Sequence, residues 1–209
     1  MELLQQIAEQ LDKGQAAAVA ELTAKAIDEG VSPEKILNDG LIAGMDVVGE
    51  KFRARQIFLP HVLLAAKAMH AGMDLLKPLL VQQDVPRAGK AVLGTVRGDQ
   101  HDIGKNLVGI MLEGAGFEVV DLGTDVAPAA FLAAAREHGA TVIGMSALLT
   151  TTMPSMKSTV EAMKSEGLDV AKIMIGGAPV TQDYANDIGA DGYAADAASA
   201  VEVARSLLA

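Results

Sequence analysis

The chain has 209 residues, half of them apolar, with a formal net charge of −10 and no cysteine. This length is enough for one sizeable core and a smaller companion, so we expect two domains. The chain has 17 basic and 27 acidic residues, and its four Phe, two Tyr and no Trp provide few rings for base stacking. The composition therefore excludes nucleic-acid binding as a function class.

The sequence indicates neither a membrane-spanning helix nor a secretory signal peptide. Charge or glycine interrupts every apolar stretch before the roughly 18 residues that a membrane-spanning helix needs. The first residues, MELLQQIAEQLDKG, lack the basic region and apolar run of a signal peptide. Without cysteine there is no disulfide framework. We therefore expect a cytoplasmic protein that does not associate with membranes.

The first 82 residues have helical periodicity throughout. A helix is expected over 15–29, ended by Gly30. Ser32-Pro33-Glu34 supplies an N-cap and a proline at the first helical position for an amphipathic run to Val48. Another helix is expected to begin at Pro60. Together these segments predict a small helical bundle.

A different pattern follows the polar segment 82–89, which we take as a linker between domains at 1–84 and 90–209. Short apolar runs now alternate with helical stretches. The runs are 91–96, 117–122, 141–145, 172–175 and 192–194, and the helices are 103–114, 129–138, 153–165, 182–188 and a last one to Leu208. Five such units predict an α/β domain with a Rossmann-like (flavodoxin-like) five-stranded parallel sheet.

Ligands of such sheets bind outside the carboxyl ends of the strands, where strand order reverses. With the order 2-1-3-4-5, the loops after strands one, three and four form one wall, comprising residues 98–104, 146–152 and 176–179. The loop after strand two, 123–125, would lie off to the side. The wall is where we expect the functional site.

Each loop also has an ordinary interpretation. His101 is either a solvated surface residue or a metal ligand, and Asp99 would fix its tautomer in the second case. Ser146 and the threonines up to Thr152 are either helix N-caps or site residues. Gly176-Gly177 is either a strand-to-loop turn or room for a ligand. Their occurrence on one wall favours a site, and the lack of a Gly-x-Gly-x-x-Gly or Gly-Lys-Ser/Thr loop disfavours nucleotide binding.

These loops resemble the three motifs of cobalamin-binding proteins that bind the cofactor with its own base displaced. Asp99, His101 and Gly104 match Asp-x-His-x-x-Gly, Ser146-x-Leu148 matches the second motif, and Gly176-Gly177 the third. The runs 101–106 and 119–123 are typical of methionine synthase modules and corrinoid methyltransferase subunits. The helical half is similar to the cap of these proteins, through Phe52, Arg55, Gln56 and Ile57-Phe58-Leu59-Pro60.

The resemblance implies a role for each matched position. His101 would bind cobalt in place of the cofactor's base, with Asp99 behind it and Thr152 extending the relay where methionine synthases have serine. Phe52 and Leu59 would shield the upper face, although an apolar pair at helical spacing is otherwise read as bundle core. The slot for the base and its tail would involve Ser146, Leu148, Thr150, Gly176 and Gly177. The rest of the first motif would also contact the cofactor: Gly98, Gln100, Asp102, Ile103 and Gly104.

A cap plus a cobalamin domain resembles the small corrinoid subunits of methyltransfer systems. The implied function is a non-catalytic carrier that holds a methyl group on the cobalt of methylcobalamin or another corrinoid. One methyltransferase would load it from a donor, another would pass it to tetrahydrofolate or a thiol coenzyme, and a reductive activase would restore the cofactor. The alternative is a cobalamin-dependent sensor, which usually adds a DNA-binding module, and this chain has no basic recognition helix.

Overall fold

The computed structural model describes residues 2–82, 87–167 and 171–209. The chain divides into two compact units, Met1–Pro86 and Arg87–Ala209. Residues 83–86 of the expected linker lie outside the described part. Across the described ranges, no helix combines the length and apolarity needed to cross a membrane.

The first unit is the expected bundle of helices. Ser32 caps α3 as predicted, since its hydroxyl accepts a hydrogen bond from the Lys35 N–H. The run expected as one helix to Val48 contains a π-helical stretch, which apolar periodicity does not distinguish from α-helix. The helices are α1 (Glu2–Asp12), α2 (Ala16–Asp28), α3 (Pro33–Ile36), η1 (Leu37–Ile42), α4 (Ala43–Arg53) and α5 (Leu59–Gln82).

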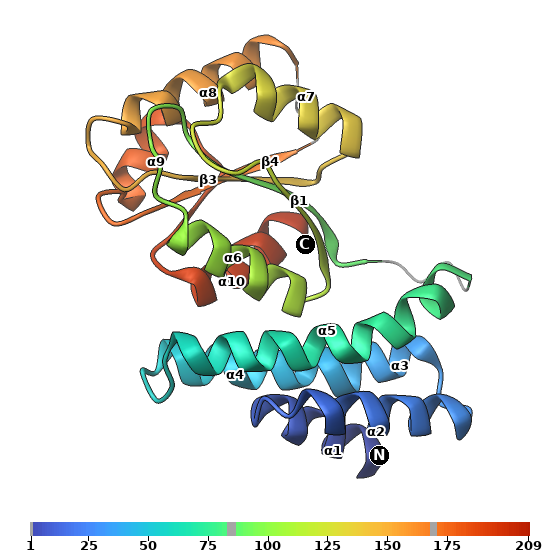
Figure 1. The fold of residues 1–209 in the computed structure, drawn as a ribbon. Coiled ribbons are helices and arrows are strands. Elements are labelled where there is room, and N and C mark those ends of the chain that lie inside the picture. The colour runs from blue at the N-terminus through green and yellow to red at the C-terminus, as the bar shows by residue number, and fades with distance from the viewer. Residues whose placement is uncertain (1, 83–86, 168–170) are drawn as a thin grey trace. The chain divides into compact units, whose positions relative to one another are not determined.

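The second unit is a five-stranded parallel sheet in the order β2-β1-β3-β4-β5, which confirms the predicted fold class. Figure 1 shows α7, α8 and α9 on one face of this sheet and α6 and α10 on the other. The strands are β1 (Gly89–Thr95), β2 (Phe117–Asp121), β3 (Val142–Ser146), β4 (Lys172–Gly176) and β5 (Gly192–Ala194). The helices are α6 (Ile103–Gly114), α7 (Pro128–His138), α8 (Met153–Ser165), α9 (Gln182–Ile188) and α10 (Ala197–Leu208).

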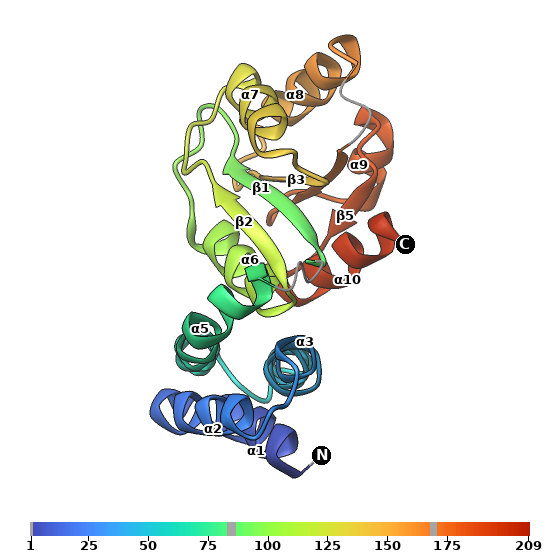
Figure 2. The same cartoon turned by 90° about the vertical axis from the view of Figure 1, so that its right-hand side faces the viewer.

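The interior strand β1 is almost entirely buried, as a parallel strand covered on both faces should be. Its neighbours β2 and β3 flank it on either side in Figure 2. Gly94 lies where α7 packs on the strand, and a Cβ added there would be 2.6 Å from Cζ of the fully buried Phe131. This close packing fixes the strand whose carboxyl end leads into the first predicted motif.

Replacing Gly94 with leucine should therefore destabilise the second unit. Added side-chain atoms would displace Phe131 from a filled core, and overpacking of this kind costs about 1–3 kcal/mol. Urea unfolding should report the loss as a lower transition midpoint. Ala133→Leu, on the exposed side of α7, should change the free energy of unfolding by no more than about 0.5 kcal/mol; equal effects of the two substitutions would contradict the packing argument.

Candidate functional site

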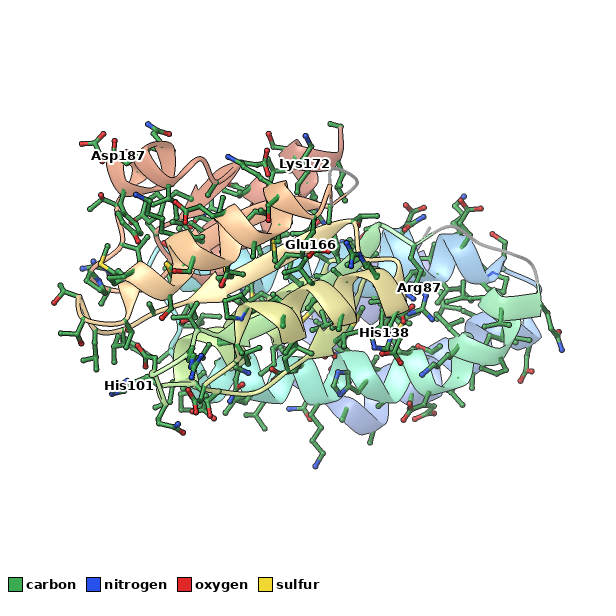
Figure 3. The ribbon with its side chains drawn as sticks, turned by 90° about the horizontal axis from the view of Figure 1, so that it is seen from above. Arg87, His101, His138, Glu166, Lys172 and Asp187 are labelled. Atoms are coloured by element: carbon green, nitrogen blue, oxygen red, sulfur yellow. The ribbon has the colours of Figure 1, made fainter. Side chains whose placement is uncertain are left out.

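The carboxyl ends of three neighbouring strands form the expected wall. Thr95 of β1 is in register with Ser146 of β3, and Ser146 is in register with Gly176 of β4. The loops that follow these strands therefore begin side by side. His101 lies at this end of the unit, while His138 and Lys172 lie at the other (Figure 3).

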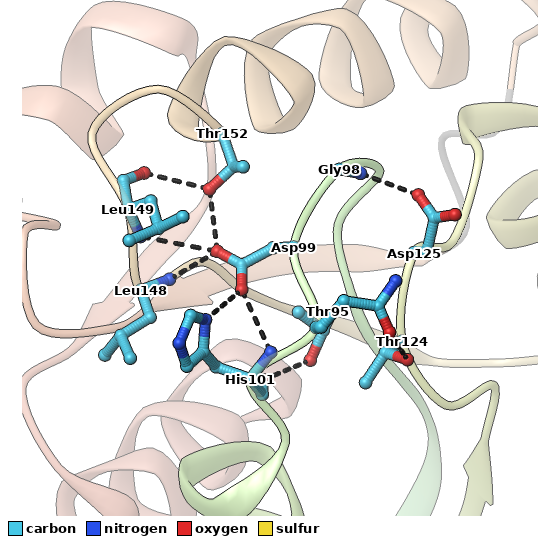
Figure 4. Close-up of polar contacts among 10 residues, drawn as sticks. Thr95, Gly98, Asp99, His101, Thr124, Asp125, Leu148, Leu149 and Thr152 are labelled. Carbon is cyan, nitrogen blue, oxygen red and sulfur yellow. Dashed lines mark hydrogen bonds and ion pairs between the residues drawn. The ribbon is translucent and has the colours of Figure 1, made fainter.

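The Asp99 carboxylate joins the first two loops (Figure 4). One oxygen, Oδ2, accepts hydrogen bonds from Leu148 N at 2.8 Å, Leu149 N at 3.3 Å and the Thr152 hydroxyl at 2.7 Å. The other, Oδ1, accepts from His101 N at 3.0 Å and lies 2.7 Å from His101 Nδ1. The side chain is completely buried. Five donor groups therefore surround one inaccessible carboxylate.

These donors determine the charge of Asp99. Burial alone would raise the pKa of this carboxyl, but hydrogen bonds from Thr152, His101 and Leu148 outweigh it and hold the pKa well below its usual range. An ionised carboxylate only accepts hydrogen bonds, so the proton of a neutral His101 ring is on Nδ1. Nε2 then keeps its lone pair on a side chain that is 51% exposed. This is the arrangement in which a carboxylate orients a histidine for metal binding.

Thr152 has the partner that the family resemblance implies. Its hydroxyl lies 2.7 Å from Asp99 Oδ2 and 2.9 Å from the Leu149 carbonyl oxygen. It makes no capping bond to α8, although it occupies the N-cap position, so the alternative interpretation as a helix cap is wrong for this residue. The side chain is buried with Asp99.

Thr95 was not among the predicted residues. Its hydroxyl donates to the carbonyl oxygen of His101 at 2.9 Å, and the side chain is fully buried. The main-chain N–H and C=O of His101 and its Nδ1 atom are thus all engaged. A hydroxyl that follows the apolar stretch 91–94 of β1 was the available signal.

The loop after β2 does not lie off to the side as expected. Asp125 Oδ1 accepts a hydrogen bond from Gly98 N at 2.7 Å, and the Thr124 hydroxyl donates to Gln100 Oε1 at 3.1 Å. Parallel pairing continues past β2 through a bridge between Val96 and Val126. The loop is therefore attached directly to the first motif.

The predicted glycines differ in what surrounds them. Gly177 has φ +131°, and a Cβ there would lie 1.9 Å from the Ala147 carbonyl oxygen, so the backbone alone requires glycine. At Gly176 a Cβ would lie 2.9 Å from the Ala194 carbonyl oxygen. Both results support the interpretation as a strand-to-loop turn. At Gly104, which is exposed, a Cβ would have no neighbouring protein atom within 4 Å.

The remaining predicted residues of the second unit have the following environments. Ser146 is half-buried at the end of β3, whereas Thr150 is exposed. The Leu148 side chain is 43% exposed and that of Ile103 is 73% exposed. Asp102 accepts a hydrogen bond from the Asn106 side chain at 3.1 Å. The wall thus presents apolar side chains close to His101 in sequence and structure.

Phe52 and Leu59 belong to the helical unit. Phe52 lies in the last turn of α4 and Leu59 is the first residue of α5, so they are not on one helix. Both are half-buried, and neither is part of the buried core. The two therefore do not form a pair at helical spacing on one helix, and neither is among the fully buried residues of the bundle.

Comparison with known proteins gives matches over both units. Profiles described as "B12 binding domain" match residues 89–202 and residues 3–77. The dimethylamine corrinoid protein of Methanosarcina barkeri is 47% identical, with 100% of this chain and 98% of that protein covered. A corrinoid protein of Desulfitobacterium hafniense is 43% identical with the same coverage. The crystal structure of the methanol:cobalamin methyltransferase complex of Methanosarcina barkeri contains a similar chain, with TM-score 0.87, 33% identity and coverage of 99% and 80%.

Asp99→Asn should remove a pH-dependent part of the stability. Because the folded-state pKa of Asp99 is lowered from 3.8, the ionised side chain stabilises the fold fully above about pH 5, and this contribution is lost progressively as the pH falls from about 4 towards the lowered pKa. The free energy of unfolding of the wild type should therefore exceed that of the variant by about 1.5–3 kcal/mol at pH 7. This difference should become smaller in urea titrations repeated towards pH 2.5. Asp187→Asn, at an exposed carboxylate, should show no such narrowing; a gap for Asp99→Asn that is constant over this range would contradict the argument.

Proposed function

Since the chain belongs to the family of B12-binding corrinoid proteins of methyltransferase systems, we propose that it carries a methyl group on the cobalt of its corrinoid. In this proposal His101 would hold the cobalt through Nε2. The observation that carries it is the pair formed by the buried Asp99 carboxylate and His101 Nδ1 at 2.7 Å. That contact leaves Nε2 as the free donor of an oriented ring.

The residues around the site fit such a group. When bound, the corrinoid supplies a cobalt centre that accepts and releases a methyl group. His101 orients this centre, Asp99 holds the Nδ1 proton, and Thr152 donates to the far oxygen of Asp99. Open space at Gly104 and the exposed side chains of Leu148 and Ile103 give apolar contact area and room for a large ring.

The other predicted residues complete the proposed site. Ser146, Thr150 and the Gly176-Gly177 turn would line the slot for the displaced base and its tail. As the family resemblance implies, Phe52 and Leu59 would shield the methyl group. Neither is locked into the bundle core, so both have apolar surface to offer.

The relatives suggest the class of donor. One is a dimethylamine corrinoid protein, and another chain forms part of a methanol:cobalamin methyltransferase complex. We therefore expect a methylamine or methanol methyltransferase to load the methyl group and a second methyltransferase to pass it to tetrahydrofolate or a thiol coenzyme. A reductive activase would restore cofactor that has become oxidised. The proposal includes a cytoplasmic location for all these components.

Reconstitution tests the carrier function directly. The corrinoid-loaded, reduced protein is mixed with methyltransferases for dimethylamine, trimethylamine or methanol and the matching donor, and methylation of cobalt is followed by its absorption change. One donor and enzyme pair should methylate the protein far faster than free corrinoid. Failure of every pair to do so, with correctly loaded protein, would refute the proposed donor class.

His101→Ala should remove nitrogen coordination without abolishing corrinoid binding, because the rest of the wall remains. Electron paramagnetic resonance of the Co(II) form should show superhyperfine splitting from a histidine nitrogen in the wild type and lose it in the variant. His138→Ala, at the opposite end of the unit (Figure 3), should leave the spectrum unchanged. Splitting that persists in His101→Ala would exclude this residue as the ligand.

Gly104→Leu should weaken corrinoid binding while the fold is retained. The new side chain would enter space that no protein atom occupies, so it would compete with the ligand rather than with the core. We expect a loss of affinity of roughly tenfold or more, equivalent to about 1.4 kcal/mol, measured by equilibrium titration with hydroxocobalamin. Ala129→Leu is the matched control, because Ala129 is also the second residue of the helix after its strand and is exposed; similar losses in both variants would contradict the assignment.

A further inference from the structure

The loops after β1 and β2 are joined by main-chain and side-chain hydrogen bonds (Figure 4). Asp125 makes two of them: its carboxylate accepts from Gly98 N at 2.7 Å, and its own N–H donates to the Asp99 carbonyl oxygen at 3.0 Å. Gly98 and Asp99 immediately precede the turn that presents His101. Asp125 therefore holds the base of that turn from the loop after β2, which lies outside the three predicted motifs.

The backbone of Asp125 has an unusual conformation. Its φ is +54°, in the left-handed region that favours glycine. Asp tolerates this region better than most side chains, but glycine occupies it at no steric cost. A carboxylate kept at such a position is explained by the bond that it makes to Gly98 N, which glycine cannot make.

Thr95 holds the other end of the same turn. Its hydroxyl donates to the His101 carbonyl oxygen, and its own N–H and C=O pair with Gly123 O at 3.0 Å and Val126 N at 2.9 Å in the β2 loop. The turn is thus attached to the β2 loop at its start through Asp125 and at His101 through Thr95. All of these contacts lie within the second unit and involve only protein atoms.

We propose that Asp125 is a positioning residue for His101, which it keeps in the metal-binding arrangement by fixing the Gly98–Asp99 segment to the β2 loop. This inference rests on the proposed role of His101 as the cobalt ligand. It adds a second attachment, independent of the Asp99 carboxylate and made by protein atoms alone. Loss of the attachment should let the turn move, so that His101 spends less time within reach of the metal.

Two substitutions of Asp125 separate the carboxylate from the backbone. Asp125→Gly suits the positive φ but removes the acceptor for Gly98 N, whereas Asp125→Asn retains a side-chain oxygen that can accept the same bond. In the cofactor-free protein, amide hydrogen exchange at Gly98 and His101 should rise roughly tenfold in Asp125→Gly, as expected for loss of a hydrogen bond to a charged group. In Asp125→Asn the increase should be several times smaller.

The loaded protein provides the second measurement. Asp125→Gly should still bind hydroxocobalamin, but the histidine-coordinated fraction of its Co(II) form, read from nitrogen superhyperfine splitting, should fall clearly below that of the wild type. Asp125→Asn should restore most of this fraction. Asp191→Gly is the matched control, because the Asp191 carboxylate likewise accepts a backbone bond, from Ile173 N at 2.8 Å, just before β5. This control should leave unchanged both the amide exchange at Gly98 and His101 and the histidine-coordinated fraction of the Co(II) form.

Each outcome decides the inference. Unchanged exchange at Gly98 in Asp125→Gly would show that the bond does not hold the turn, and raised exchange with an unchanged histidine-coordinated fraction would show that the bond does not position His101. Changes in Asp191→Gly equal to those in Asp125→Gly would show that both variants act by general destabilisation of the fold. If wild-type protein carried the corrinoid without histidine coordination, the proposed function of His101 would fail, while raised exchange in the cofactor-free variant would still establish the attachment.

Discussion

The structure of the site depends on the burial of one negative charge. The Asp99 carboxylate lies between the loops after β1 and β3 and is bound there by main-chain N–H groups, a hydroxyl and an imidazole. A buried ion without such donors would be very costly, so the two loops can pack only in the arrangement that supplies them. The adjacency of β1 and β3 in the sheet is what makes this arrangement possible.

The chemical nature of the donors also matters. The groups that hold Asp99 are neutral amides, a hydroxyl and a ring that can itself become charged, so they lower its pKa without cancelling its charge. The carboxylate therefore acts on His101 as a full anion. It fixes the ring orientation, makes Nε2 a stronger donor and stabilises positive charge on whatever Nε2 binds. A lysine or arginine in the place of these donors would have weakened all three effects.

Much of this arrangement was predictable from the sequence, because it follows from periodicity and local motifs. The alternation of apolar runs and helices indicated the parallel sheet and the wall, and the spacing of Asp99 and His101 indicated the pair. The π-helical stretch at 37–42 and the hydrogen bonds between Asp125 and the loop after β1 were missed. Apolar periodicity does not register one extra residue in a helical turn, and hydrogen bonds between loops such as that from Gly98 to Asp125 leave no periodic trace. The steric requirement for glycine at position 177 likewise appears only in the folded structure, where the Ala147 carbonyl oxygen lies beside this residue.

Thr152 has one hydroxyl proton and two acceptors within reach, Asp99 Oδ2 and the Leu149 carbonyl oxygen. While Asp99 is ionised, the proton belongs on the bond to the carboxylate. Were Asp99 to receive a proton on Oδ2, the same hydroxyl could turn its own proton to Leu149 and accept the new one, so that the direction of the bond reverses. Because the hydrogen bonds to Asp99 hold its pKa well below the usual range, this reversal would need strong acid; it would rotate one O–H group while every heavy atom stays where it is. A serine would offer the same two bonds, but the methyl group of threonine restricts the rotation of the side chain that carries the hydroxyl.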